Sequence, residues 1–209
     1  PEMAARELRR AMGSRGLLGF HLASNIRGRN LDDPTLEPVW EAAQESGAFV
    51  FVHPFRVAAA DRLKAYYLTN LIGNPLETTI AAASLIFGGV IERYPAITFC
   101  FAHGGGFTPY QAGRFIHGWN VRPEPKQFLK EGPAESLGRL YYDTILHSDA
   151  MLQHLIGAVG ASRVMLGSDY PFDMGYYEGV RQVRSLSIPE SDQALILGGT
   201  AKSLLRMAS

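Results

Sequence analysis

The strongest constraint on the fold of this sequence is a set of five short apolar runs, each followed by a longer segment with a helical pattern. The runs cover residues 16–23, 48–52, 97–102, 139–143 and 163–166. Their apolar residues do not alternate with polar ones, which is typical of parallel strands buried on both faces. Helix signals separate them, for example Asp33 before Pro34 and Gly47 after an amphipathic stretch. The pattern predicts a βα repeat, either an open doubly wound sheet or part of a barrel.

The residues that follow each run favour the barrel. The chain has one glycine-rich turn, at 103–106, and it matches neither the dinucleotide-binding motif nor the phosphate-binding P-loop. The runs end instead in polar or metal-competent side chains: Ser24-Asn25, His53, His103, Asp143-Thr144 and Ser168-Asp169. In (β/α)8 barrels the chemistry lies at the C-terminal ends of the strands, where neighbouring loops converge. We therefore expect residues 1–209 to form a single domain of barrel type.

One of the connecting helices carries its own start and stop signals. It is predicted to begin at Asn74 and Pro75, with Glu77 in the position of a capping box. It is expected to continue to Tyr94, because Pro95 cannot extend a helix.

Composition restricts the partners and the compartment. Lysine plus arginine number 20, as do aspartate plus glutamate, so no net field would attract nucleic acid or an anionic membrane surface. A small molecule is the expected partner. The single cysteine, Cys100, excludes an intrachain disulfide and favours a cytoplasmic location. No segment has the roughly 18 to 20 uninterrupted apolar residues that a membrane span needs.

His53, His103 and Asp169 are the candidates for chemistry. Each has a plain structural explanation on its own: a hydrogen-bonded strand end before Pro54, a tight turn before three glycines, and a cap for the turn after 164–168. Taken together, three strands place a metal-type side chain at the same end of one fold. Two imidazoles and a carboxylate suit zinc or a similar divalent ion that keeps a position for water. Such an ion lowers the pKa of its water, and a nearby histidine or aspartate can move the proton.

The order of the motifs resembles a known family. The chain contains, in this order, GFHLASNIRGRNLDDP, FVHPF, NPLETTIAA, FAHGGGFTPYQAGR, YYDT and LGSDYPF. This series resembles the amidohydrolase-2 group of the amidohydrolase superfamily, and most closely the aminocarboxymuconate semialdehyde decarboxylases. The resemblance implies an α/β fold, the (β/α)8 TIM barrel of the metal-dependent hydrolases, in which these five strands would be the fourth to the eighth. The first three strands would then be lacking. The first of them carries two metal ligands in that family, in a His-x-His (HxH) motif. We therefore expect an N-terminally truncated chain.

The resemblance also implies a role for individual residues. His53 resembles the metal ligand of the fifth strand, and Asp169 resembles the carboxylate ligand of the eighth. His103 resembles the acid/base that activates a metal-bound water. Arg114 resembles an arginine that reaches a substrate carboxylate across a homodimer interface, although a surface arginine would look the same. Tyr67 lies near the position of a pocket aromatic. Zinc is the expected metal, with manganese as the alternative.

The function implied is that of a metal-dependent, non-oxidative decarboxylase of a small unsaturated or aromatic carboxylic acid. Two alternatives stay open at this point. One is a hydrolase of a lactone, ester or amide that uses the same activated water, and the other is a catalytically inactive barrel fragment. We expect the four histidines without an assigned role, His21, His117, His147 and His154, to be structural or surface residues. His147 is the first candidate for an exception among them, because it follows a predicted strand on the active side.

Overall fold

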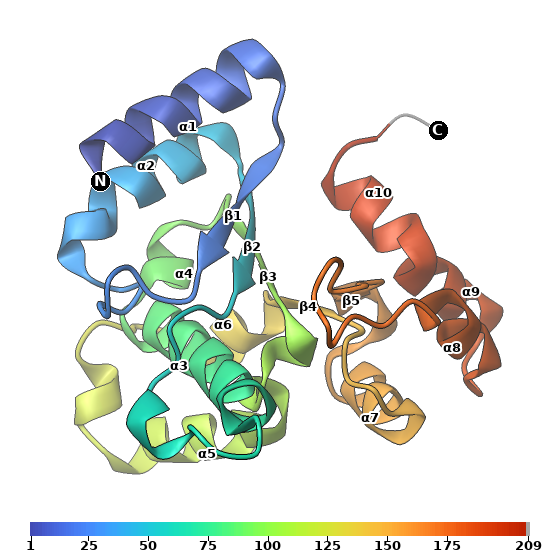
Figure 1. Cartoon of the computed structure of the whole chain (residues 1–209). Coiled ribbons are helices and arrows are strands. Elements are labelled where there is room, and N and C mark those ends of the chain that lie inside the picture. Colours follow the sequence, from blue (N-terminus) through green and yellow to red (C-terminus); the bar gives the residue numbers. More distant parts are fainter. Residues whose placement is uncertain (208–209) are drawn as a thin grey trace.

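A computed structural model describes residues 1–207 of the chain. Its centre is a sheet of five strands: β1 Gly19–Ala23, β2 Phe49–His53, β3 Thr98–Phe101, β4 Tyr141–Asp143 and β5 Val164–Met165. Neighbouring strands are parallel and follow one another in sequence order. The five predicted strands and the α/β class are confirmed. Within residues 1–207, β1 and β5 are the two edges of the sheet (Figure 1).

Helices connect the strands and cover the sheet. They are α1 Glu2–Arg15, α2 Glu37–Ser46, α3 Asn74–Phe87, α4 Val90–Arg93, α5 Thr108–Val121, α6 Pro133–Gly138, α7 Asp149–Val159, α8 Gly179–Ser185, α9 Glu190–Ala194 and α10 Thr200–Leu204. Figure 1 shows α1 and α2 side by side near β1, and α8 to α10 together beyond β5. No helix in the described part of the chain is long and apolar enough to cross a membrane.

The core lies between the sheet and these helices. In β2 the side chains of Val50 and Val52 are fully buried, and Phe99 and Phe101 of β3 pack in the same layer. Trp40 of α2 contacts this layer edge-on, with its ring 5.7 Å from that of Phe99. The opposite face of β2, which includes His53, is only half-buried. The prediction of strands buried on both faces is therefore met only in part by β2, whose second face, with Phe49, Phe51 and His53, is half-buried.

Two details of the helices differ from the sequence prediction. A π-helical turn, Thr69–Gly73, runs straight into α3, so Asn74 is inside a helical segment and makes no cap. The helix ends at Phe87, because Gly88 and Gly89 follow and Gly89 takes a left-handed φ of 70° before α4 begins. The predicted caps at Asp33 and Gly47 are confirmed: the carboxylate of Asp33 accepts from the Thr35 amide, and Gly47 has a φ of 58°.

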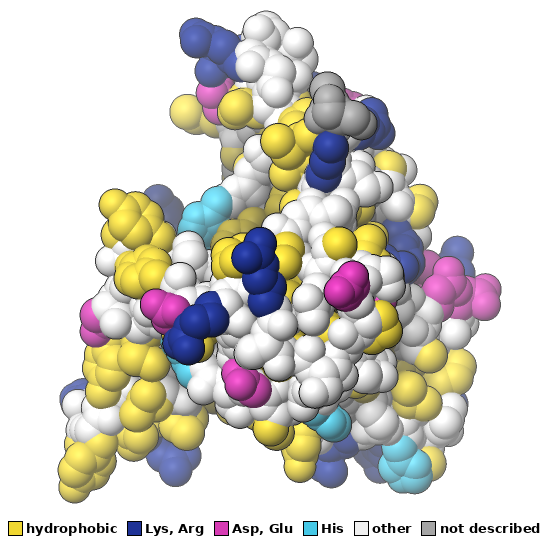
Figure 2. Space-filling view, turned by 90° about the vertical axis from the view of Figure 1, so that its right-hand side faces the viewer, with side chains coloured by type: hydrophobic (Ala, Val, Ile, Leu, Met, Phe, Trp, Pro, Cys, Tyr) yellow, Lys and Arg dark blue, Asp and Glu magenta, His cyan; other side chains and the backbone are white. Residues whose placement is uncertain are grey.

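Charged side chains are dispersed over the surface. On the face that Figure 2 shows, lysine and arginine side chains lie among polar and apolar ones and do not gather into one large patch. Ion pairs such as Arg9 with Glu45 join neighbouring helices at exposed positions. Their contribution to the free energy of unfolding is small, about 0 to 1 kcal/mol each.

Candidate metal centre

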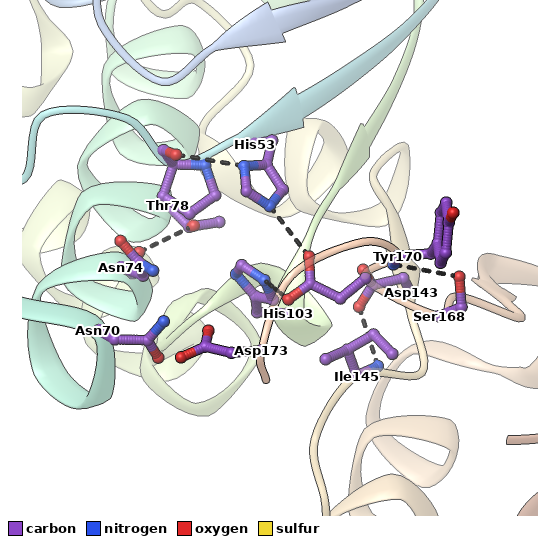
Figure 3. A network of polar contacts seen from close by, with 12 residues as sticks. His53, Asn70, Asn74, Thr78, His103, Asp143, Ile145, Ser168, Tyr170 and Asp173 are labelled. Carbon is purple, nitrogen blue, oxygen red and sulfur yellow. Dashed lines mark hydrogen bonds and ion pairs between the residues drawn. The ribbon is translucent and has the colours of Figure 1, made fainter. Parts of the chain in front are cut away.

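His53, His103 and Asp169 meet at the C-terminal edge of the sheet. His53 is the last residue of β2, His103 follows β3, and Asp169 lies in the loop after β5. Nε2 of His53 is 3.2 Å from Oδ1 of Asp169, and Nε2 of His103 is 3.4 Å from Oδ2 of the same carboxylate. Figure 3 shows the imidazoles of His53 and His103 next to each other, and their ring centroids are 5.0 Å apart. The side chains are 16%, 15% and 10% exposed, so a small molecule can still reach them.

The three side chains fit a divalent ion. Their ligand atoms all lie within 4.8 Å of one another. Nδ1 of His53 lies 3.2 Å from the carbonyl oxygen of Pro54, which can only accept a hydrogen bond. When Nδ1 donates to this carbonyl, Nε2 keeps a lone pair on the side of Asp169, where it can bind a metal ion. Nδ1 of His103 is buried without a hydrogen-bond partner among the described residues.

Aromatic side chains surround His53. The ring of Phe172 stacks on it at 5.4 Å with an interplanar angle of 14°. His21 of β1 contacts it edge-on at 5.5 Å. Burial lowers the pKa of His21, and the neighbouring His53 lowers it further. The imidazole of His53 is therefore held between β1 and the loop that carries Asp169.

The turn after His103 depends on its glycines and on Asp143. His103 has a left-handed φ of 56°, and Gly106 has a φ of 61°. A Cβ at Gly106 would lie 2.2 Å from the carbonyl oxygen of Pro75, so only glycine fits. Oδ1 of the buried Asp143 accepts from the backbone N–H of Gly104 at 2.9 Å and of Ile145 at 3.0 Å. Burial raises the pKa of the Asp143 carboxyl. Asp143 thus anchors the turn that orients His103, a role that its place at a strand end did not reveal.

Glu77 is a second anchor that the sequence analysis missed. The predicted capping box is wrong, because its side chain is 4% exposed and points into the structure from α3. One oxygen accepts from Nδ2 of Asn25 at 2.8 Å, and the other accepts from the N–H of Ala58 at 2.9 Å. Glu77 therefore ties together the loops after β1 and β2, next to His53. Its only signal in the sequence is a carboxylate on the apolar face of a helix.

A cavity of about 200 Å³ opens beside the metal-type side chains. His103, Asp169 and His147 line it, together with the amides of Asn70 and Asn74. Its remaining wall is apolar: Leu71, Pro75, Ile145, Leu146 and Met174. Such a mixture of an apolar wall and a few convergent polar groups is typical of a small-molecule site.

Tyr67 lies beside this cavity, whereas Arg114 lies away from it. The hydroxyl of Tyr67 donates to the carboxylate of Asp173, at 2.8 and 2.9 Å to its two oxygens, and Nδ2 of Asn70 lies 3.3 Å from that hydroxyl. The hydrogen bond to Asp173 raises the pKa of Tyr67. Tyr67 thus lies beside the cavity, next to Asn70. Arg114 is exposed on α5 and does not line the cavity.

Comparison with known proteins agrees with this architecture. The chain is 39% identical over 206 residues to 2-amino-3-carboxymuconate-6-semialdehyde decarboxylase of Dictyostelium discoideum, covering 98% of this chain and 57% of the relative. The protein of the same name from Caenorhabditis elegans is 32% identical over 201 residues, covering 81% and 50%. The crystal structure of 5-carboxyvanillate decarboxylase from Sphingomonas paucimobilis superimposes with a TM-score of 0.90 at 28% identity, covering 100% of this chain and 64% of that one.

The matches cover nearly all of this chain but only part of each relative. The chain spans about half to two-thirds of the length of these relatives. A family model described as amidohydrolase matches residues 1–207. With three metal-type side chains at the C-terminal edge of a parallel sheet, and with this match over nearly its whole length, the chain belongs to the amidohydrolase family.

Proposed function

We propose that the protein is a metal-dependent, non-oxidative decarboxylase of a small unsaturated or aromatic carboxylic acid. The observation that carries the proposal is the convergence of His53, His103 and Asp169 beside a cavity of small-molecule size. The named relatives support the reaction type, because both the sequence relatives and the structural neighbour are decarboxylases of such acids. They favour a decarboxylase over the hydrolase of a lactone, ester or amide.

His53 and Asp169 would hold the metal. Their facing Nε2 and Oδ1 atoms are ligand types that zinc prefers, and manganese is the alternative ion. A divalent ion at this place would act as a Lewis acid and would lower the pKa of a coordinated water toward neutrality. The Pro54 carbonyl and the Phe172 ring would keep His53 oriented toward the ion.

His103 would move the proton. In the overall reaction the bond between the carboxyl group and the substrate carbon breaks, its electron pair stays on that carbon, and a proton takes the place of the carboxylate. The imidazole of His103 lines the cavity and is positioned by the Asp143 anchor, so it is the group best placed to deliver that proton. Tyr67 would shape the cavity from its rim through Asn70.

Arg114 would act between subunits. It is exposed on α5 and away from the cavity of its own chain, which suits a guanidinium that binds a substrate carboxylate in the neighbouring subunit of a homodimer. We further propose a cytoplasmic location, since the single cysteine is a buried, free thiol.

The reaction is tested by metal analysis together with product analysis. Protein loaded with zinc or manganese is incubated with aminocarboxymuconate semialdehyde, 5-carboxyvanillate and 2,6-dihydroxybenzoate, and released carbon dioxide is measured. Matched lactones and esters serve as hydrolase substrates. We expect about one bound ion per chain and carbon dioxide from at least one acid. Hydrolysis of an ester or lactone without any release of carbon dioxide would contradict the proposal.

The dimer is tested separately. Sedimentation gives the oligomeric state, and mixing Arg114→Ala chains with Asp169→Ala chains tests whether the subunits complement each other. Recovery of activity in the mixture is expected if Arg114 serves the neighbouring site. An unchanged Michaelis constant for the acid in Arg114→Ala would exclude this role.

A further inference from the structure

His147 lies on the wall of the cavity and has no role in the reaction proposed above. It follows β4, in the segment 144–148 between that strand and α7, and it lines the same cavity as His103 and Asp169. Its ring contacts Tyr176 edge-on, with 5.7 Å between centroids and an interplanar angle of 85°. The backbone N–H of Tyr176 in turn donates to the carbonyl of Ser168, next to Asp169. His147 is thus packed against the loop that carries Asp169.

The backbone at His147 has the same unusual conformation as the two other ionisable residues of the cavity. The φ angles of His103, His147 and Asp169 are 56°, 53° and 53°, in the left-handed region that residues with a Cβ rarely adopt. Such conformations persist where the surrounding structure imposes them, and they cluster at functional sites. Arg27, Arg56, Ala59, Tyr66, Tyr67 and Arg206 also have a positive φ, so this conformation accompanies the site and does not by itself define it.

The segment that carries His147 is held on both sides. Oδ1 of Asp143 accepts from the N–H of Ile145, and the hydroxyl of Thr144 accepts from the N–H of Gly167 at 3.1 Å. On the other side, the hydroxyl of Ser148 caps α7 by accepting from the N–H of Met151. These bonds limit the freedom of the backbone at His147, whose exposed side chain lies at the wall of the cavity.

The polar groups of the cavity show what His147 can bind. Among the described residues that line it there is no lysine or arginine, and Asp169 contributes a negative charge. The donors that one chain offers a substrate carboxylate here are the amides of Asn70 and Asn74 and the imidazoles of His103 and His147, beside the Arg114 guanidinium proposed to come from the neighbouring subunit. His103 is next to Asp169, whereas the recorded contact of His147 is the edge of the Tyr176 ring, which leaves its ring nitrogens for a ligand. We infer that His147 is a substrate-binding residue that donates a hydrogen bond to the carboxylate of the acid; this inference rests on the proposed decarboxylase function.

The test compares two ligands that differ in one carboxylate. Binding of 2,6-dihydroxybenzoate and of resorcinol to the metal-loaded protein is measured by calorimetry for the wild type and for His147→Asn. Asparagine tolerates a left-handed φ, so the backbone is kept while the imidazole is lost. His147→Gln serves as a second variant with a longer side chain. The matched control is His154→Gln, an exposed histidine on α7 whose ring lies near Tyr110 and outside the cavity.

We expect His147→Asn to weaken binding of the carboxylate about tenfold, the loss of one hydrogen bond to a charged group, and to change resorcinol binding less than twofold. His154→Gln should bind both ligands as the wild type does. Equal weakening of both ligands, no weakening of either, or a wild type that does not prefer the carboxylate would each overturn the assignment. If the wild type prefers the carboxylate through His147 but releases no carbon dioxide from any acid, the proposed reaction fails and the binding role of His147 stands.

Discussion

Nε2 of His53 and Oδ1 of Asp169 lie 3.2 Å apart, although 116 residues separate them in the chain. The two atoms meet because β2 and β5 are parallel strands of one sheet, and the loops after parallel strands converge at the same edge. β2 and β5 are separated by β3 and β4 in the sheet, so these four strands must form before the pair can bind a metal ion. Metal binding and folding of residues 49–169 are expected to be coupled.

Removal of the Asp169 carboxylate is expected to abolish metal binding. Asp169→Ala deletes the oxygens that face both histidines, so bound metal should fall from about one ion per chain to near zero, with loss of turnover. The measurement is elemental analysis of purified, dialysed protein. Asp173→Asn is the matched control, because Asp173 is a nearby carboxylate that accepts from Tyr67. An ion retained at full stoichiometry in Asp169→Ala would refute the ligand assignment.

Substitutions of His53 and His103 should have different effects on metal content and on turnover. His53→Gln is expected to lose the metal, because it removes a ligand. His103→Gln is expected to keep the metal and to lower kcat by about 10² to 10⁴, the usual contribution of a general acid or base. Both are read out by metal content and steady-state kinetics on the same preparations. Equal loss of metal in the two variants would make His103 a ligand instead.

Gly106 should not tolerate a side chain. Gly106→Ala places a Cβ 2.2 Å from the Pro75 carbonyl oxygen at a φ of 61°, so α3 and the turn after His103 must move apart. We expect a loss of roughly 2 to 4 kcal/mol in the free energy of unfolding, measured with urea. Gly113→Ala is the control, since its Cβ would meet nothing within 4 Å and helix α5 should gain roughly 0.5 to 1 kcal/mol. Equal stabilities for the two variants would contradict this geometry.

Glu77 should stabilise the loops that flank His53. Glu77→Ala removes the acceptor of the part-buried Ala58 N–H and one acceptor of Asn25 Nδ2, which keeps the carbonyl oxygen of Phe55. The expected loss is about 1 to 3 kcal/mol in the free energy of unfolding for a donor left unsatisfied. Glu41→Ala, at an exposed position on α2, should change it by less than about 0.5 kcal/mol. A neutral Glu77→Ala would mean that water replaces the carboxylate without cost.

Cys100 should make stability fall at alkaline pH. Burial, and then Asp143, raise the pKa of the thiol well above its value in the unfolded chain. A group whose pKa is raised by folding contributes stability that is present below the unfolded pKa and is lost as pH rises above it, here above about 9. The loss is at most about 1.4 kcal/mol per pH unit. Urea unfolding between pH 7 and 10 should show this extra slope in the wild type and not in Cys100→Ala.

Local signals in the sequence predicted the strands and part of the helices. Each strand is a short apolar run between clear helix signals, and the caps at Asp33 and Gly47 depend on residues within a few positions of each other. The helix from Asn74 was harder to delimit, because a π-helical turn precedes it and a break follows it at Gly88. Gly73, in the π-helical turn, packs against Val57. Gly88 itself packs against Asp32.

The sequence by itself determined the set of chemical groups: His53, His103 and Asp169 at the ends of strands, and motifs in the order of one family. Only the tertiary structure decided how they meet. It placed Nε2 of each histidine at one carboxylate, brought His147 into the same cavity, and left Arg114 on an exposed helix. It also turned Glu77 inward as an anchor. The physical reason is that such side-chain contacts arise from packing across the sheet, between residues far apart in the chain, and no local pattern encodes them.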